Sequence, residues 1–149
     1  MNTRAVCEGS FTLPLPLADA VALFTPEGER SWAGRHWDPV YAIPPAPGDD
    51  AAPGTVFTTE STGGDATWIV LERREDGMKY ARVVPGRLAG TVDVRCSRDA
   101  DSGDGTHVSV CYDVTSLGPA GALFVEELER GYEAFLADWR REILAACSS

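Results

Sequence analysis

Hydrophobic side chains near the C-terminus recur at the spacing of an α-helix. Steps of three and four residues connect six apolar positions and put them on one helical face (Phe124, Leu128, Tyr132, Phe135, Trp139 and Ile143). Pro119 suits the first turn of such a helix. The pattern predicts one long amphipathic helix over about the last thirty residues. Its aromatic stripe needs a large, curved apolar surface to lie against.

Upstream of this helix the pattern changes to strands separated by glycine-containing turns. Five segments are rich in Val, Thr, Tyr and Trp: residues 54–61, 66–74, 78–85, 89–98 and 106–116. In the last two, apolar and polar side chains alternate, so one face of the sheet is expected to be dry and the other wet. We therefore expect an antiparallel meander that is covered on one face by the terminal helix.

The N-terminal third adds one more strand and two short helices. Residues 4–13 alternate between apolar and polar side chains, which predicts a half-buried strand. Residues 17–24 and 29–34 predict short helices, whereas residues 37–53 contain five prolines and predict a surface loop that caps one end of the domain. The whole pattern predicts an α+β fold with about six or seven antiparallel strands, in a single domain over residues 1–149.

Charge and cysteine usage exclude several classes of protein. The formal net charge is −10, so nucleic-acid phosphates and anionic membrane surfaces should repel the chain. No stretch approaches the ~20 apolar residues that span a bilayer, and the N-terminus leads directly into strand-like sequence. Four scattered cysteines have no C-x-x-C spacing, which indicates reduced thiols and a cytoplasmic protein. Strand alternation puts Cys7 and Cys111 on opposite faces, so these two should not pair.

Several short segments resemble a known superfamily. They are Leu-Phe-Thr-Pro-Glu-Gly-Glu-Arg at 23–30 with Trp32, Trp-Asp-Pro at 37–39, Gly-Thr-Val-Phe at 54–57, Thr-Trp-Ile-Val at 67–70 and Tyr-Asp-Val-Thr at 112–115. Together with the order of elements they resemble the helix-grip fold of the START-like (SRPBCC) superfamily, which includes the birch-pollen allergens and aromatic polyketide cyclases. The likeness covers nearly the whole chain and is nearest to bacterial members without an assigned role. The glycine-rich loop of the allergen branch has no clear counterpart.

The resemblance implies a deep cavity between the sheet and the long helix, which in this superfamily commonly takes a hydrophobic small molecule such as a lipid, a sterol or a polyketide. Trp32, His36, Trp37 and Tyr41 would then lie near its mouth. They would either bind a ring system of the ligand or fill the open end of the sheet as ordinary core residues. The candidate ligand-binding residues are Trp32, His36, Trp37, Tyr41, Trp68, Tyr80, Arg82, Tyr112, Phe124 and Tyr132.

Arg82 is the candidate with the most specific chemistry, because it is a cation on a predicted apolar strand face. It shares a strand face with Met78, Tyr80 and Val84 if Lys79 points to solvent. A guanidinium on a dry face is unfavourable unless it is paired, and it could hold a ligand carboxylate or phenolate by a bidentate bond. Alternatively, it pairs with a buried acid of this chain or lies at an exposed strand end.

The sequence gives only weak signals for catalysis or for metal binding. His36 could act as a general base beside Asp38, but no nucleophile motif accompanies it. The aspartates around residue 101 do not have the register of a calcium loop, and we expect no metal and no cofactor. Gly131 interrupts the terminal helix, either to leave room for a ligand or to permit a bend.

Three functions follow from these observations. The first is the binding or transport of a hydrophobic, ring-containing small molecule, by a monomer or homodimer. The second is an enzyme of the polyketide cyclase or dehydratase type, in which Arg82, Tyr80, Tyr112 or His36 polarise carbonyls or move protons. It requires at least two of these residues to converge on one region. The third is a protein-interaction module that resembles the Hsp90-activator relatives, which needs an exposed patch on the wet sheet face.

Overall fold

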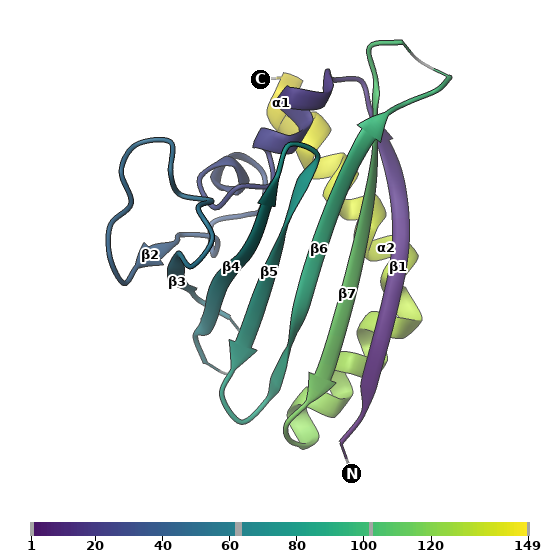
Figure 1. Ribbon diagram of the computed structural model, residues 1–149. Helices are drawn as coiled ribbons and strands as arrows, with labels where there is room; N and C mark the ends of the chain where they lie inside the picture. Colours follow the sequence, from purple (N-terminus) through teal and green to yellow (C-terminus); the bar gives the residue numbers. More distant parts are fainter. Residues whose placement is uncertain (1, 62–63, 102, 149) are drawn as a thin grey trace.

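A computed structural model describes residues 2–61, 64–101 and 103–148. Within these residues, seven antiparallel strands form one open sheet in the order β1-β7-β6-β5-β4-β3-β2 (Figure 1). The strands are β1 Arg4–Leu13, β2 Val40–Tyr41, β3 Val56–Thr59, β4 Ala66–Arg74, β5 Gly77–Val84, β6 Leu88–Arg98 and β7 Thr106–Ser116. The helices are α1 Leu17–Ala22, the 3-10 turn η1 Gly28–Ser31 and the long C-terminal α2 Pro119–Ser148. This is the α+β helix-grip architecture that the sequence predicts.

Strands β2 to β7 follow one another across the sheet as a meander, and β1 lies at the edge next to β7. β1 pairs with β7 along its whole length, from Arg4 opposite Thr115 to Leu13 opposite Thr106. Alternation is clear in β7, where Val108, Val110, Tyr112 and Val114 are buried. Two local expectations were wrong. The second short helix is a single 3-10 turn, and the proline-rich loop contains β2, which pairs with β3 through Val40 and Tyr41.

The long helix crosses the concave face of the sheet and packs against β1 and β7 (Figure 1). Its predicted stripe is confirmed, because Leu128, Tyr132 and Ile143 are buried and the other three members pack against the core. The Tyr132 hydroxyl donates a hydrogen bond of 2.8 Å to the Val110 carbonyl. A Cβ on Gly9 of β1 would lie 2.6 Å from Leu136 Cδ1, so the absence of a side chain there lets the helix approach the sheet.

The helix bends at Gly131, whose φ of −108° and ψ of 18° leave the helical region. This residue is exposed, and a Cβ on it would meet open space. Of the two interpretations of Gly131, the bend is therefore the one that the structure shows. A glycine that points to solvent leaves no room for a ligand beneath the helix.

No helix among the described residues combines the length and apolar character needed to cross a membrane. The four cysteines are free thiols, and Cys7 and Cys111 do not pair.

Candidate functional site

Two hollows lie between the concave sheet face and the helical elements. The first, which we call the aromatic hollow, has a volume of about 340 Å³. The second, the outer hollow, has a volume of about 480 Å³ and reaches toward the start of α2. Both are lined by His36, Glu60, Ser61 and Arg82, so they adjoin. Each volume lies at the small end of the ~300–1,000 Å³ that is typical of small-molecule sites.

Ring–ring contacts build the walls of the aromatic hollow. Trp32 lies 5.1 Å from Trp139 of α2, measured between ring centroids, in an edge-to-face arrangement. Trp37 lies 5.3 Å from Trp68 of β4, and Tyr112 of β7 packs edge-on against its aromatic neighbours on α2. Because the sheet, the loop after η1 and α2 each contribute rings, the wall is held from three sides.

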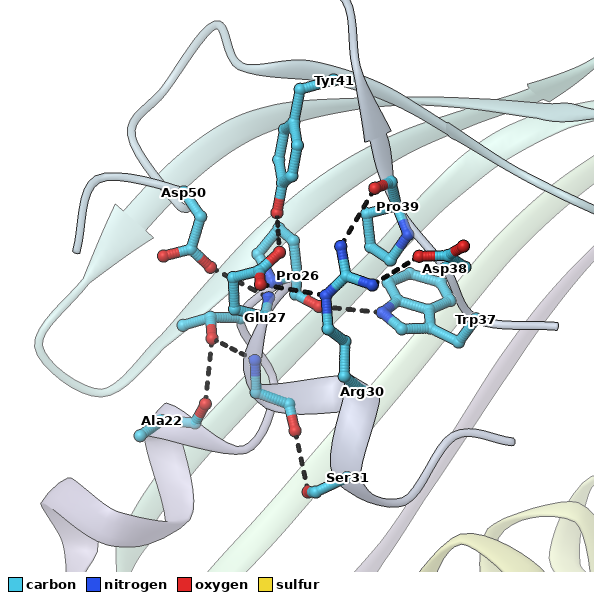
Figure 2. A network of polar contacts seen from close by, with 12 residues as sticks. Ala22, Pro26, Glu27, Arg30, Ser31, Trp37, Asp38, Pro39, Tyr41 and Asp50 are labelled. Carbon is cyan, nitrogen blue, oxygen red and sulfur yellow. Dashed lines mark hydrogen bonds and ion pairs between the residues drawn. The ribbon is translucent and has the colours of Figure 1, made fainter. Parts of the chain in front are cut away.

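A polar network around η1 fixes the residues that lead into this wall (Figure 2). The Glu27 carboxylate accepts hydrogen bonds from the Arg30 guanidinium and from the Tyr41 hydroxyl. Arg30 also donates to the Asp38 carboxylate and to the Pro39 carbonyl. One guanidinium therefore ties the 3-10 turn to the segment that follows it, and the Trp37 between them is held in place.

Both tryptophans of this region have fixed indole groups. The Trp37 indole N–H donates to the Pro26 carbonyl at 2.8 Å, and the Trp32 indole N–H donates to the Leu23 carbonyl at 2.8 Å. Their polar atoms are thus satisfied by the backbone, and the apolar ring surfaces are left to line the hollow.

Arg82 extends from β5 into both hollows. Its guanidinium carbon lies 5.3 Å from the ring centroid of Trp68 and 5.5 Å from that of Phe124. The Nε atom is buried without a hydrogen-bond partner, and no described acid forms an ion pair with this side chain. Burial lowers the pKa of Arg82, with Arg87 as a secondary cause, despite the opposing effect of Tyr112. Pairing with a buried acid, the alternative interpretation of Arg82, is not what the described structure contains.

Tyr112 presents its phenol to the aromatic hollow beside Arg82. It accepts or donates no hydrogen bond among the described side chains, and burial raises the pKa of its hydroxyl. The phenol therefore stays protonated and is available to donate to a ligand.

The structure separates the ten candidate residues into two groups. Seven line a hollow: Trp32, His36, Trp37, Trp68, Arg82, Tyr112 and Phe124. Three do not, and their hydroxyl groups are used within the protein. Tyr41 donates to Glu27, Tyr80 donates to the Phe24 carbonyl at 2.6 Å and Tyr132 donates to Val110. We leave these three out of the site.

His36 stands at the rim, where its side chain is 73% exposed and lies 3.6 Å from the Glu60 carboxylate. The suggested His36–Asp38 pair is not formed, because Asp38 binds Arg30 instead. Among the residues that the structure describes, no three His, Cys, Asp or Glu side chains gather in a way that could hold a metal ion.

No family model matches the sequence, and no curated protein matches it. Solved structures match in fold. An uncharacterised protein from Rhizobium leguminosarum superposes with a TM-score of 0.66 at 15% identity over 97% of each chain. Norcoclaurine synthase from Thalictrum flavum, in complex with dopamine and hydroxybenzaldehyde, has a TM-score of 0.64 at 11% identity, over 97% of this chain and 88% of that one. CalU16 from Micromonospora echinospora has a TM-score of 0.60 at 17% identity, over 95% of this chain and 83% of that one.

The chain has the helix-grip fold, which it shares with these solved structures. In this helix-grip domain the two hollows lie where the long helix spans the concave sheet. Identities of 11–17% establish the shared architecture, and the site has to be argued from its own side chains.

Sequence reasoning missed three important lining residues: Glu29, Phe135 and Trp139. The two aromatics belong to the predicted helical stripe, of which only Phe124 and Tyr132 are among the candidate ligand-binding residues. Glu29 stands three positions before Trp32, and residues at this spacing eclipse each other on a 3-10 turn. That spacing was the available signal that Glu29 faces inward with the tryptophan.

Proposed function

We propose that this helix-grip domain binds a small hydrophobic molecule that contains an aromatic ring and an acidic group. The observation that carries the proposal is Arg82, a largely buried guanidinium that lies between two aromatic rings and has an unsatisfied Nε–H. Burying such a cation without a partner is unfavourable. A ligand carboxylate or phenolate would supply the partner through a bidentate, charge-assisted bond.

The aromatic walls define the remainder of the ligand. Flat rings pack well against two edge-to-face pairs, Trp32 with Trp139 and Trp37 with Trp68. A hollow of about 340 Å³ favours a molecule of one or two rings over a large lipid. The norcoclaurine synthase structure, whose complex contains dopamine and hydroxybenzaldehyde, gives an example of this fold with small ring-containing molecules.

The experiment begins with native mass spectrometry of the gently purified protein, to detect a co-purifying acid. Fluorescence titration with 8-anilinonaphthalene-1-sulfonate, an anionic ring-containing probe, then compares the affinity of the wild type with that of Arg82→Met. Loss of a charge-assisted bond of ~1.5–3 kcal/mol corresponds to a loss of affinity of roughly 10- to 150-fold.

Arg95→Met is the matched control, because Arg95 lies on the neighbouring strand with an exposed side chain that pairs with Asp93. It removes the same charge from the protein and should leave probe affinity within about twofold. Equal binding by the wild type and Arg82→Met would overturn the proposal.

An enzyme of the polyketide cyclase or dehydratase type is a second candidate. One observation favours it, since Arg82, Tyr112 and His36 all line the aromatic hollow and so converge on one region. A carbonyl oxygen placed between the guanidinium and the phenol would be polarised by both donors. Once a ligand has been identified, the test is whether it is released chemically changed. Recovery of the unchanged molecule after incubation counts against catalysis and leaves binding in place.

A further inference from the structure

Glu29 is a buried acid that the ligand site described so far does not use. It lies in the middle of η1, is 9% exposed, and lines the aromatic hollow together with Trp32. Its backbone is fully engaged, because its N–H donates to the Thr25 carbonyl and its carbonyl accepts from the Trp32 and Ala33 N–H groups. The backbone is thus fixed, and the side chain stands on a rigid turn.

The carboxyl group itself has no partner among the described residues. Arg30, the basic neighbour on the same turn, donates instead to the carboxylates of Glu27 and Asp38 (Figure 2). No ion pair joins Glu29 to Arg82 in the described structure, although both line the same hollow. A buried polar group without a partner inside a binding hollow is available to a ligand.

Burial raises the pKa of Glu29 well above its ordinary value. The titratable and charged groups around it are Tyr80 and Arg82 of β5, Tyr112 of β7, Asp138 and Glu142 of α2, and His36 with Glu60 at the rim. The raised pKa favours the protonated carboxyl, which can donate one hydrogen bond and accept another.

We propose that the Glu29 carboxyl is a second anchor of the ligand site, which exchanges hydrogen bonds with a hydroxyl or carbonyl oxygen of the ligand while Arg82 holds the acidic group. The ligand class narrows to aromatic acids that carry a second oxygen function away from the acid. This inference rests on the proposed binding function and adds a specificity-determining residue to it.

The test compares 2-naphthoate with a panel of hydroxynaphthoates that carry the hydroxyl at different ring positions, with affinities measured from ligand fluorescence. In the wild type, at least one hydroxynaphthoate should bind about 3- to 10-fold more tightly than 2-naphthoate, which is the contribution of one hydrogen bond. Glu29→Gln should retain the preference, because an amide also donates and accepts. Glu29→Leu should remove it.

Controls separate this inference from the binding function. Glu133→Leu makes the same change on the exposed face of α2 and should leave the preference intact. Arg82→Met should weaken 2-naphthoate and the hydroxynaphthoates alike. A preference that survives in Glu29→Leu, or a wild type that prefers no hydroxynaphthoate, overturns the role of Glu29 while binding through Arg82 stands. Naphthoate binding that Arg82→Met leaves unchanged would overturn the binding function instead. The melting temperatures of Glu29→Leu and Glu29→Gln verify that both variants fold.

Discussion

Glu27 and Glu29 stand two residues apart around one 3-10 turn, yet their carboxyl groups have opposite surroundings. Glu27 is exposed and bound by Arg30 and Tyr41, which lower the pKa of its carboxyl chiefly through the Tyr41 hydrogen bond. Glu29 is buried in the aromatic hollow without a described partner, and burial raises its pKa. The same side chain is thus held toward its ionised form at Glu27 and toward its protonated form at Glu29.

The two arginines of these regions repeat the contrast. Arg30 donates to two carboxylates and a carbonyl, whereas Arg82 lies between two rings with an unsatisfied Nε–H. Arg30, whose hydrogen bonds are satisfied, holds the loop that carries Trp37, whereas Arg82, whose Nε–H is unsatisfied, faces the hollow. Polar groups that a fold leaves unpaired in an apolar cavity are the ones to expect in a binding site.

Trp37 belongs to both regions, so its removal should have the largest effect. Trp37→Ala takes away a ring of the wall and the hydrogen bond to Pro26. We expect a loss of about 3 kcal/mol in the free energy of unfolding, together with weaker probe binding. Urea denaturation and probe titration measure the two effects. Trp37→Phe, which keeps a ring, should recover most of the binding; failure to do so would mean that the indole N–H, not the wall, matters.

Glu27→Ala tests the network alone. It removes the shared acceptor of Arg30 and Tyr41, and we expect a loss of about 1–2 kcal/mol in stability, because exposed pairs contribute little singly but act here as a network. Affinity for the naphthoate probes should change less than twofold, because Arg30 still binds Asp38 and Pro39 and the Trp37 indole still binds the Pro26 carbonyl. A large loss of affinity in the folded variant would contradict the separation of the two regions.

Glu29→Gln should change the dependence of stability on pH. The folded pKa of Glu29 is raised above its unfolded value, so the folded state binds the proton more tightly and wild-type stability falls as pH rises above about 4.5. The variant lacks this dependence. The difference in free energy of unfolding in favour of the variant should be absent at acid pH. As the pH rises, this difference should grow by at most ~1.4 kcal/mol per pH unit, until Glu29 ionises in the folded wild type. Urea denaturation of both proteins across pH measures the difference, and parallel pH curves would contradict a raised pKa of Glu29.

Arg82→Met should have the smallest effect on stability, and of the opposite sign. Replacing an unpaired, desolvated cation by an apolar side chain of similar length should raise the free energy of unfolding by about 1 kcal/mol, after the loss of two cation–π contacts. Thermal unfolding without ligand measures the change. A marked destabilisation would show that Arg82 serves the fold, not a ligand.

Most of the fold was predictable from local patterns, whereas the site was only partly so. Strand alternation and the helical stripe identified the meander and α2, because each element must bury one face. The pairing of β1 with β7, and the addition of β2 at the opposite edge, join segments far apart in the sequence, which no local pattern encodes. Arg82 was recognised because a cation on an apolar strand face conflicts with its surroundings. Tyr80 was an equally good candidate for the ligand site by sequence, but its hydroxyl donates to the Phe24 carbonyl.

The sequence by itself determined most of the secondary structure and the aromatic character of the interior, since periodicity and residue type follow from the chain alone. The helix-grip class followed from the resemblance of several short segments to a known superfamily. The tertiary structure decided which polar groups have partners. Arg30 could have paired with Glu27, with Glu29 or with neither, and only the position of Asp38 and Tyr41 across the turn directs it outward. Pairing depends on distances between segments that the fold brings together, and those distances left Glu29 and Arg82 facing the hollow.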